Sequence, residues 1–212
     1  MLFDVITIFP NFFKGFVNES LLARAQKKNI LSINIHNLRD WTTDNHKTVD
    51  GKPFGGGVGM VLKIEPIYKA VKAIKKKNKK VKVVLFSPRG KTFDQKMARR
   101  FSKLDQLIMI SGRYEGVDER VAEYIADEVV SIGDFVMSGG EVPAMVLIET
   151  ISRMIPGVIA KKESAEKPDH PQYTRPEIFE LKGKKIKVPA VLLSGNHAKI
   201  EEWRKKHTGK IK

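Results

Sequence analysis

Two apolar runs, each followed at once by a glycine-rich segment, constrain the fold of this chain more than any other feature. The runs cover residues 107–110 and 129–132, and the segments cover residues 111–116 and 133–141. Short apolar runs bounded by glycine are typical of buried strands, and glycine allows positive φ angles and a close approach of backbone. Two such loops predict a small-molecule cleft lined by main chain. The alternative is that these glycines only make turns.

Strand and helix patterns alternate along most of the chain, which predicts an α/β fold with a mostly parallel sheet. The predicted strands cover residues 2–8, 30–38, 81–86, 107–110 and 128–132. The predicted helices cover residues 10–28, a stretch from Glu65 into the lysine run at 75–80, a stretch from a capping box at 92–95, and residues 118–126 and 141–155. Residues 39–60 lack a clear period, so we expect a long loop, of a kind that is usually functional or disordered.

The composition changes after Gly157, where polar, charged and proline-bearing sequence continues to residue 187 and reads as a linker. The predicted organisation is a main domain, an interdomain linker and a C-terminal segment, at residues 1–160, 161–176 and 177–212. Within the last part, residues 188–193 are predicted to be extended and residues 198–206 to form a short basic helix.

The charge balance points to a polyanionic partner. The chain carries a formal net charge of +15, and residues 161–212 hold 14 Lys or Arg against 7 Asp or Glu. A basic excess in one segment favours nucleic acid, because each neutralised phosphate releases counterions. The lysine run at 75–80 is interpreted instead as solvated surface.

Several classes of protein are excluded or disfavoured by the sequence. The absence of cysteine excludes disulfides and cysteine-based metal sites or nucleophiles. Scattered histidines disfavour a zinc site, and the dinucleotide, Walker and nucleophile-elbow motifs are missing. No apolar run is long enough to cross a bilayer and no signal peptide begins the sequence, so we expect a cytoplasmic protein with no membrane partner.

A set of polar residues remains that could carry chemistry, although a structural ion pair is the alternative explanation for each of them. The set consists of Arg113, Glu115, Asp118, Asp134, Glu141, Arg153, Asp169 and Arg175. Arg153 is predicted near the end of an apolar helix, and Asp169 belongs to a stiff, proline-flanked segment of the linker.

Seven segments, in order along nearly the whole chain, resemble those of the bacterial tRNA (guanine-N1)-methyltransferases, the TrmD family. They cover residues 55–57, 87–88, 112–120, 131–141, 152–158, 173–176 and 192–197. The resemblance implies a SPOUT-type parallel sheet with a deep trefoil knot, and a homodimer with a shared active site. It implies transfer of a methyl group from S-adenosylmethionine to N1 of guanine at position 37 of tRNA, next to the anticodon.

The resemblance also assigns roles to individual residues. Asp169 is expected to be the general base that removes the guanine N1 proton, Arg153 the cation that stabilises charge on O6, and Glu115 a further catalytic acid. Whether a magnesium ion accompanies Glu115 is left open, and no metal ligands are predicted. The residues expected to bind the methyl donor are Phe86, Ser87, Pro88, Gly112, Tyr114, Gly116, Ile132, Gly133, Asp134, Phe135, Val136, Met137, Gly139, Gly140 and Pro143. We expect valine at Gly112 or Gly140 to obstruct the backbone's approach to this donor.

The sequence departs from the family pattern in three places. Phe54 and Val58 flank the triple glycine where the family has tyrosine and proline. The linker is shorter, so Asp169 is its only aspartate and matches the second of two in typical members. The chain ends soon after Trp203, so we expect a truncated helical domain and weakened tRNA binding. Two other functions stay open: a non-catalytic RNA-binding module and a related methyltransferase acting on ribosomal RNA.

Overall fold

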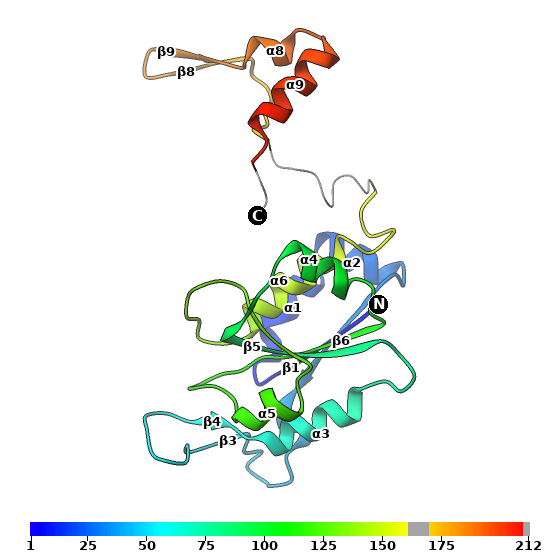
Figure 1. The fold of residues 1–212 in the computed structure, drawn as a ribbon, viewed down its shortest axis with the longest axis vertical. Helices are drawn as coiled ribbons and strands as arrows, with labels where there is room; N and C mark the ends of the chain where they lie inside the picture. Colours follow the sequence, from blue (N-terminus) through cyan, green and yellow to red (C-terminus); the bar gives the residue numbers. More distant parts are fainter. Residues whose placement is uncertain (161–169, 210–212) are drawn as a thin grey trace. The chain divides into compact units, whose positions relative to one another are not determined.

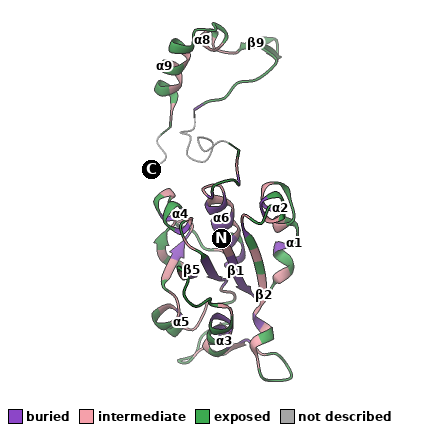
Figure 2. Cartoon of the chain, turned by 90° about the vertical axis from the view of Figure 1, so that its right-hand side faces the viewer, coloured by how far each residue is buried: buried purple, intermediate pink, exposed green. Residues whose placement is uncertain are grey.

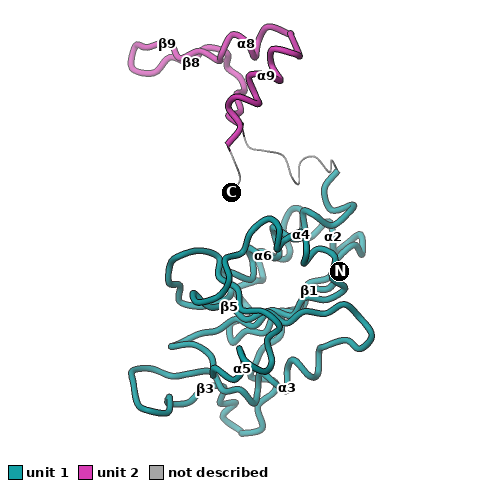
Figure 3. Tube along the Cα trace, viewed as in Figure 1, with its two compact units in different colours: residues 1–162 teal, residues 163–212 magenta. Residues whose placement is uncertain are grey.

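The computed structural model describes residues 1–160 and 170–209. The chain divides into two compact units, at residues 1–162 and 163–212 (Figure 3). In the described part of the chain, no helix has the length and apolar character needed to cross a membrane.

The first unit is built on one five-stranded parallel sheet, which confirms the predicted α/β fold with a parallel sheet. Its strands, in the order β2-β1-β6-β5-β7, are β2 (Ser32–Asn37), β1 (Leu2–Thr7), β6 (Gln106–Ile110), β5 (Val81–Thr92) and β7 (Glu128–Ser131). The central strand β6 is buried along its whole length. Its continuous apolar sequence follows from this, because both faces of the sheet are covered.

Helices cover both faces of the sheet (Figure 1). One face carries α1 (Lys14–Val17), α2 (Ser20–Lys27), α4 (Gln95–Phe101) and α6 (Glu141–Ser152), and the other carries α3 (Ile64–Ile74) and α5 (Glu119–Tyr124). Two separate apolar clusters fill the spaces between sheet and helices. Figure 2 shows buried residues concentrated in the sheet and on the inward faces of these helices.

Three predicted helix boundaries are wrong for local reasons. The helix predicted at 10–28 is divided into the 3₁₀ helix η1 (Pro10–Phe13), α1 and α2, because the Asn18 side chain donates to the Lys14 carbonyl and competes with the helical pattern. The next helix, α3, ends at Ile74 before the lysine run. The α4 helix is capped by Asp94, whose carboxylate accepts from Met97 N at 2.6 Å, and not by Thr92.

Strand β5 does not end at Phe86, as the sequence suggested, but continues to Thr92 with an irregularity. Both Phe86 and Lys91 pair with Val130 of β7, and the residues between them depart from the regular register. Gly90 lies directly against β7, because a Cβ there would be 2.6 Å from the Val130 nitrogen. Only glycine allows these two backbones to come so close.

A buried polar network joins three neighbouring strands of the sheet, β1, β2 and β6. The Asp4 carboxylate of β1 accepts hydrogen bonds from Asn34 (3.1 Å) and Gln106 (2.7 Å), and it lies 2.7 Å from His36 Nε2. Burial by itself raises the pKa of Asp4, but the hydrogen bonds from His36, Gln106 and Asn34 together bring it below its usual value. Gln106 also donates to the Ile74 carbonyl, so the network fixes the end of α3 to the sheet.

Within residues 170–209, the second unit contains a hairpin and two helices. The hairpin pairs β8 (Ile178–Leu181) with β9 (Lys184–Lys187) and is followed by α8 (Ala190–Leu193) and α9 (His197–His207). The interpretation of residues up to 187 as linker, and of 188–193 as extended, is therefore wrong, whereas the basic helix at 198–206 is confirmed. Lys182 and Gly183, both at positive φ, form the hairpin turn, and lysine at the first position gave no recognisable signal.

Candidate active site

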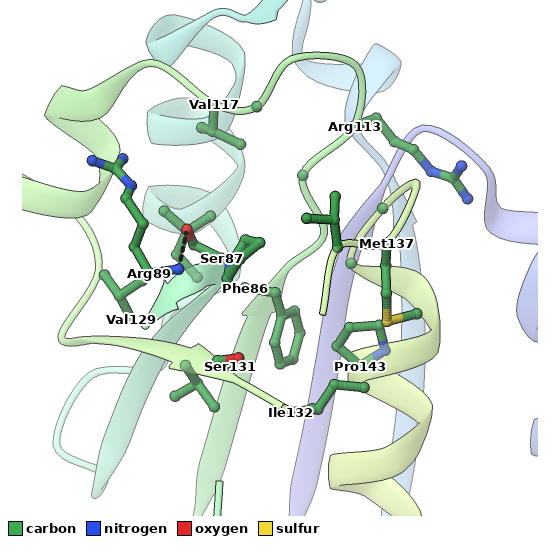
Figure 4. A pocket seen from close by; sticks show the side chains of 18 of the residues that line it. Phe86, Ser87, Arg89, Arg113, Val117, Val129, Ser131, Ile132, Met137 and Pro143 are labelled. Atoms are coloured by element: carbon green, nitrogen blue, oxygen red, sulfur yellow. Dashed lines mark hydrogen bonds between the residues drawn. The ribbon is translucent and has the colours of Figure 1, made fainter. Parts of the chain in front are cut away.

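A cavity of about 660 Å³ lies at the carboxyl ends of β5, β6 and β7 (Figure 4). This end of a parallel sheet is where ligands of α/β proteins bind. Its lining comes from the end of β5, from the segment after β6 that leads into α5, from β7 with the loop after it, and from the start of α6. The two glycine-rich segments of the sequence therefore do lie together at strand ends.

All of the predicted donor-binding residues except Asp134 line this cavity, and so does Glu115. The predicted donor-binding residues do not include several further residues of the lining, although Arg113 and Ser138 belong to the two glycine-rich segments predicted to line a cleft. These are Leu85, Arg89, Arg113, Val117, Glu119, Ala122, Val129, Val130, Ser131 and Ser138. Most of them flank the predicted residues directly in sequence, so a wider window around each motif would have included them.

The two glycine loops, residues 111–116 and 133–140, are joined to each other and are called the packed loops below. Gly140 N donates to the Gly112 carbonyl at 3.0 Å, and Arg113 and Gly139 form an isolated antiparallel bridge. A Cβ on Gly140 would lie 2.6 Å from Ser111 Cα. Valine at Gly140 would therefore displace protein backbone first, so a loss of donor binding in this variant would not by itself report on the approach of ligand to backbone.

An ion pair connects the first packed loop to the start of α6. Arg113 Nε donates to Glu141 Oε2 at 2.8 Å, and the two side chains are 15% and 1% exposed. The other carboxylate oxygen accepts from Thr7 Oγ1 at 2.7 Å. Glu141 is the first residue of α6, where the helix dipole also favours a negative charge. The Arg113 guanidinium in turn lies over the rings of Phe9 and Phe12.

The wall of the cavity is largely apolar, with polar groups contributed by backbone and hydroxyls. Figure 4 shows Phe86, Ile132 and Pro143 around its lower part. Ser131 Oγ donates to the Gly133 carbonyl at 2.8 Å, which fixes the start of the second packed loop. Such a surface suits a ligand with an apolar ring system and several hydrogen-bonding groups.

Charged residues surround the mouth of the cavity. Arg89 donates to Glu119 at 2.6 Å, and both side chains are exposed. At the start of α5, hydrogen bonds from Arg120 hold the pKa of the Asp118 carboxyl below its usual value. No group of three or more His, Asp or Glu that could hold a metal ion occurs within residues 1–160 and 170–209.

One of the predicted catalytic residues, Arg153, lies apart from the cavity lining. Arg153 is the C-terminal cap of α6, is 42% exposed, and has its Nη1 3.9 Å from Glu149 Oε1. Its position at the end of an apolar helix agrees with the sequence prediction, but it does not line the cavity. Asp169 lies outside the described residues, so its role stays a prediction.

Comparison with known proteins decides the family. The family model described as tRNA (Guanine-1)-methyltransferase TrmD matches residues 1–211. The chain belongs to the TrmD family. Among the TrmD relatives is a tRNA (guanine-N(1)-)-methyltransferase of Carboxydothermus hydrogenoformans, 48% identical over 98% of this chain and 83% of the relative. The protein of the same name from Dictyoglomus turgidum is 49% identical over 96% of this chain and 83% of the relative's length.

Proposed function

We propose that this chain transfers the methyl group of S-adenosylmethionine to N1 of the guanine at position 37 of tRNA. The observation that carries the proposal is that a TrmD family match over residues 1–211 coincides with a cavity lined from three of the seven segments that suggested the family, at residues 87–88, 112–120 and 131–141. We further propose that the enzyme acts in the cytoplasm as a homodimer.

The cavity fits the proposed methyl donor. S-adenosylmethionine supplies a methyl group activated by its sulfonium when it is bound. Its adenine ring would contact the apolar wall near Phe86 and Ile132, and its polar groups would bind backbone of the packed loops. Glycine at these positions keeps the backbone amides and carbonyls accessible.

Guanine N1 carries a proton at neutral pH, so the reaction needs a base as well as alignment. Asp169 is proposed to accept that proton. Negative charge then grows on O6 of the guanine, and Arg153 is proposed to stabilise it. Glu115, in the cavity lining, is proposed to assist near the reacting atoms.

The proposed homodimer explains why Arg153 does not line the cavity of its own chain: the base and the cation would complete a site of the partner subunit. Exposed apolar side chains support an interface here. Phe9 and Phe12 of η1 are 43% and 53% exposed, and Val142 and Val146 lie on the outer face of α6, which packs against η1. We also propose the trefoil knot that the family implies; a register irregularity between Phe86 and Lys91, which both pair with Val130, lies in the same part of the sheet.

Single-turnover methylation of an unmodified tRNA transcript with labelled donor tests the proposal. We expect transfer to a transcript with guanine at position 37 and none to one with adenine there. Asp169→Asn should lower the rate by about 10²- to 10⁴-fold and leave donor affinity in calorimetry unchanged, because an amide cannot accept the proton. The matched control is Asp105→Asn. Asp105 is exposed and directly precedes β6, at the end of that strand away from the cavity. Transfer to ribosomal RNA instead, or RNA binding without transfer, would favour the competing functions.

Mixed dimers test whether the site is shared. Val136 lines the cavity and is 87% exposed, so Val136→Arg should obstruct donor binding without disturbing the fold. Mixing this variant with Asp169→Asn should restore part of the activity, because one site then has both an intact cavity and an intact base. Mixed dimers that form and stay as inactive as their parents would contradict a base supplied by the partner.

A further inference from the structure

A loop at residues 52–60, called the open loop below, is fixed at its base to the wall of the cavity. It connects the two short strands β3 (Asp50–Gly51) and β4 (Val61–Leu62). Glu115 N donates to the Met60 carbonyl at 3.0 Å, and Leu62 N donates to the Gly116 carbonyl at 3.0 Å. The base of the open loop is therefore a neighbour of the segment that lines the cavity.

The open loop also contacts the predicted catalytic acid directly. A Cβ on Gly59 would lie 2.6 Å from both Cγ and Oε1 of Glu115. The backbone of Gly59, at a φ of +83°, thus packs on the Glu115 side chain. Any ligand that reaches Glu115 from the cavity passes close to this loop.

The tip of the open loop makes no comparable contacts. Phe54 is 101% exposed and Val58 is 89% exposed. A Cβ built on Gly55 or Gly56 would meet no atom within 4 Å. A single exposed apolar residue on a protein surface is ordinary, but here a fully hydrated phenyl group is carried by a loop whose base is fixed beside the cavity.

We propose that Phe54 stacks on a nucleobase of the tRNA anticodon loop that neighbours the methylated guanine. The proposal rests on the proposed function and adds a substrate-positioning residue to it. Chemistry at a ring nitrogen requires the target base to leave its stack, and the base beside it then loses a stacking partner. An aromatic side chain replaces that partner, since every unpaired base offers a π face. Exposed Lys52, at the start of the loop, and exposed Lys63, directly after β4, add charge for the adjoining phosphates.

Three variants and one labelled RNA test this assignment. Phe54→Ala removes the ring, Phe54→Tyr keeps it, and Tyr124→Ala removes an aromatic ring that is 79% exposed on α5 and outside the cavity lining. The RNA is a tRNA transcript with 2-aminopurine next to the target guanine. We expect Phe54→Ala to lower kcat/KM by about 10- to 100-fold and to abolish the fluorescence change on binding. Phe54→Tyr should retain both, and donor affinity should be the same in all three.

The outcomes separate this proposal from its alternatives. If Phe54→Ala behaves like Tyr124→Ala in rate and in fluorescence, the stacking assignment is wrong. If Phe54→Ala changes the sedimentation coefficient or the donor affinity, the ring contacts a second copy of the chain or the donor instead. The fluorescence measurement needs only RNA binding, so it decides the role of Phe54 even if the wild-type chain transfers no methyl group.

Discussion

The packed loops and the open loop are both rich in glycine, yet glycine serves a different purpose in each. In the packed loops, the hydrogen of Gly140 is the only substituent that fits against the backbone of Ser111. In the open loop, Gly55 and Gly56 face empty space and are required by their φ of +83° alone. A glycine-rich segment at a strand end therefore marks either close packing of protein on protein or a projecting loop, and only the neighbouring atoms distinguish the two.

The largest effect is expected from removing the ion pair under the packed loops. Glu141→Ala leaves the buried guanidinium of Arg113 without its carboxylate and should lower the free energy of unfolding by about 3 to 5 kcal/mol. The matched control is Glu119→Ala, which breaks the exposed pair with Arg89 and should cost less than about 1 kcal/mol. Urea unfolding measures the loss of unfolding free energy in both variants. Equal losses would contradict a larger contribution from the ion pair that holds the packed loops.

The next effect tests the packing of glycine itself. Gly140→Val forces a branched side chain onto the backbone at Ser111, and we expect a loss of about 3 kcal/mol in unfolding free energy, at the upper end for overpacking. Thermal unfolding of the variant without ligand provides the measurement. A fully stable protein with weakened donor binding would mean that Gly140 faces the ligand after all.

A smaller, pH-dependent effect is expected from the Asp4 carboxylate, which lies in the sheet that carries the packed loops. Because the pKa of Asp4 is lower in the folded chain, its stabilising contribution is complete above the ordinary aspartate value of about 3.9 and is lost as the pH falls through the folded-state pKa. Asp4→Asn should remove about 1.5 kcal/mol at pH 7 and flatten the acid limb of the stability curve. Urea unfolding between pH 3 and pH 7 compares the variant with wild type, and an unchanged acid limb would exclude Asp4 as its source.

The smallest effect belongs to the open loop. Gly56→Ala introduces a methyl group that meets no atom, so only the cost of the left-handed conformation remains, about 1 kcal/mol. Differential scanning calorimetry should show a small shift in Tm. Titration calorimetry should show an unchanged donor affinity. A loss as large as that of Gly140→Val would remove the distinction between the two kinds of loop.

The sequence was sufficient to locate the sheet and the cavity, because both depend on local patterns. The apolar run at residues 107–110 matched the pattern of a buried strand, which placed the glycines after it at a strand end. The resemblance to a family then narrowed the lining to particular residues, such as Phe86 and Pro143, which the structure brings together. What the cavity binds is still a prediction.

The features that the sequence did not reveal depend on contacts between distant residues or on short side chains that compete with backbone. Nothing near Lys91 indicates that it pairs with Val130, because the partner is far along the chain. Asn18 and Asp94 set helix ends through single hydrogen bonds that a propensity pattern does not resolve. The hairpin at residues 178–187 was hidden by its many charges and by an unusual turn.

The double pairing of Val130 also constrains the order in which the molecule can assemble. Phe86 can join β7 as an ordinary neighbouring strand, but Lys91 and Thr92 find their partners only once residues 130 and 131 are in position. Both pairings with Val130 join residues that are far apart in the sequence, which is the kind of contact that slows folding.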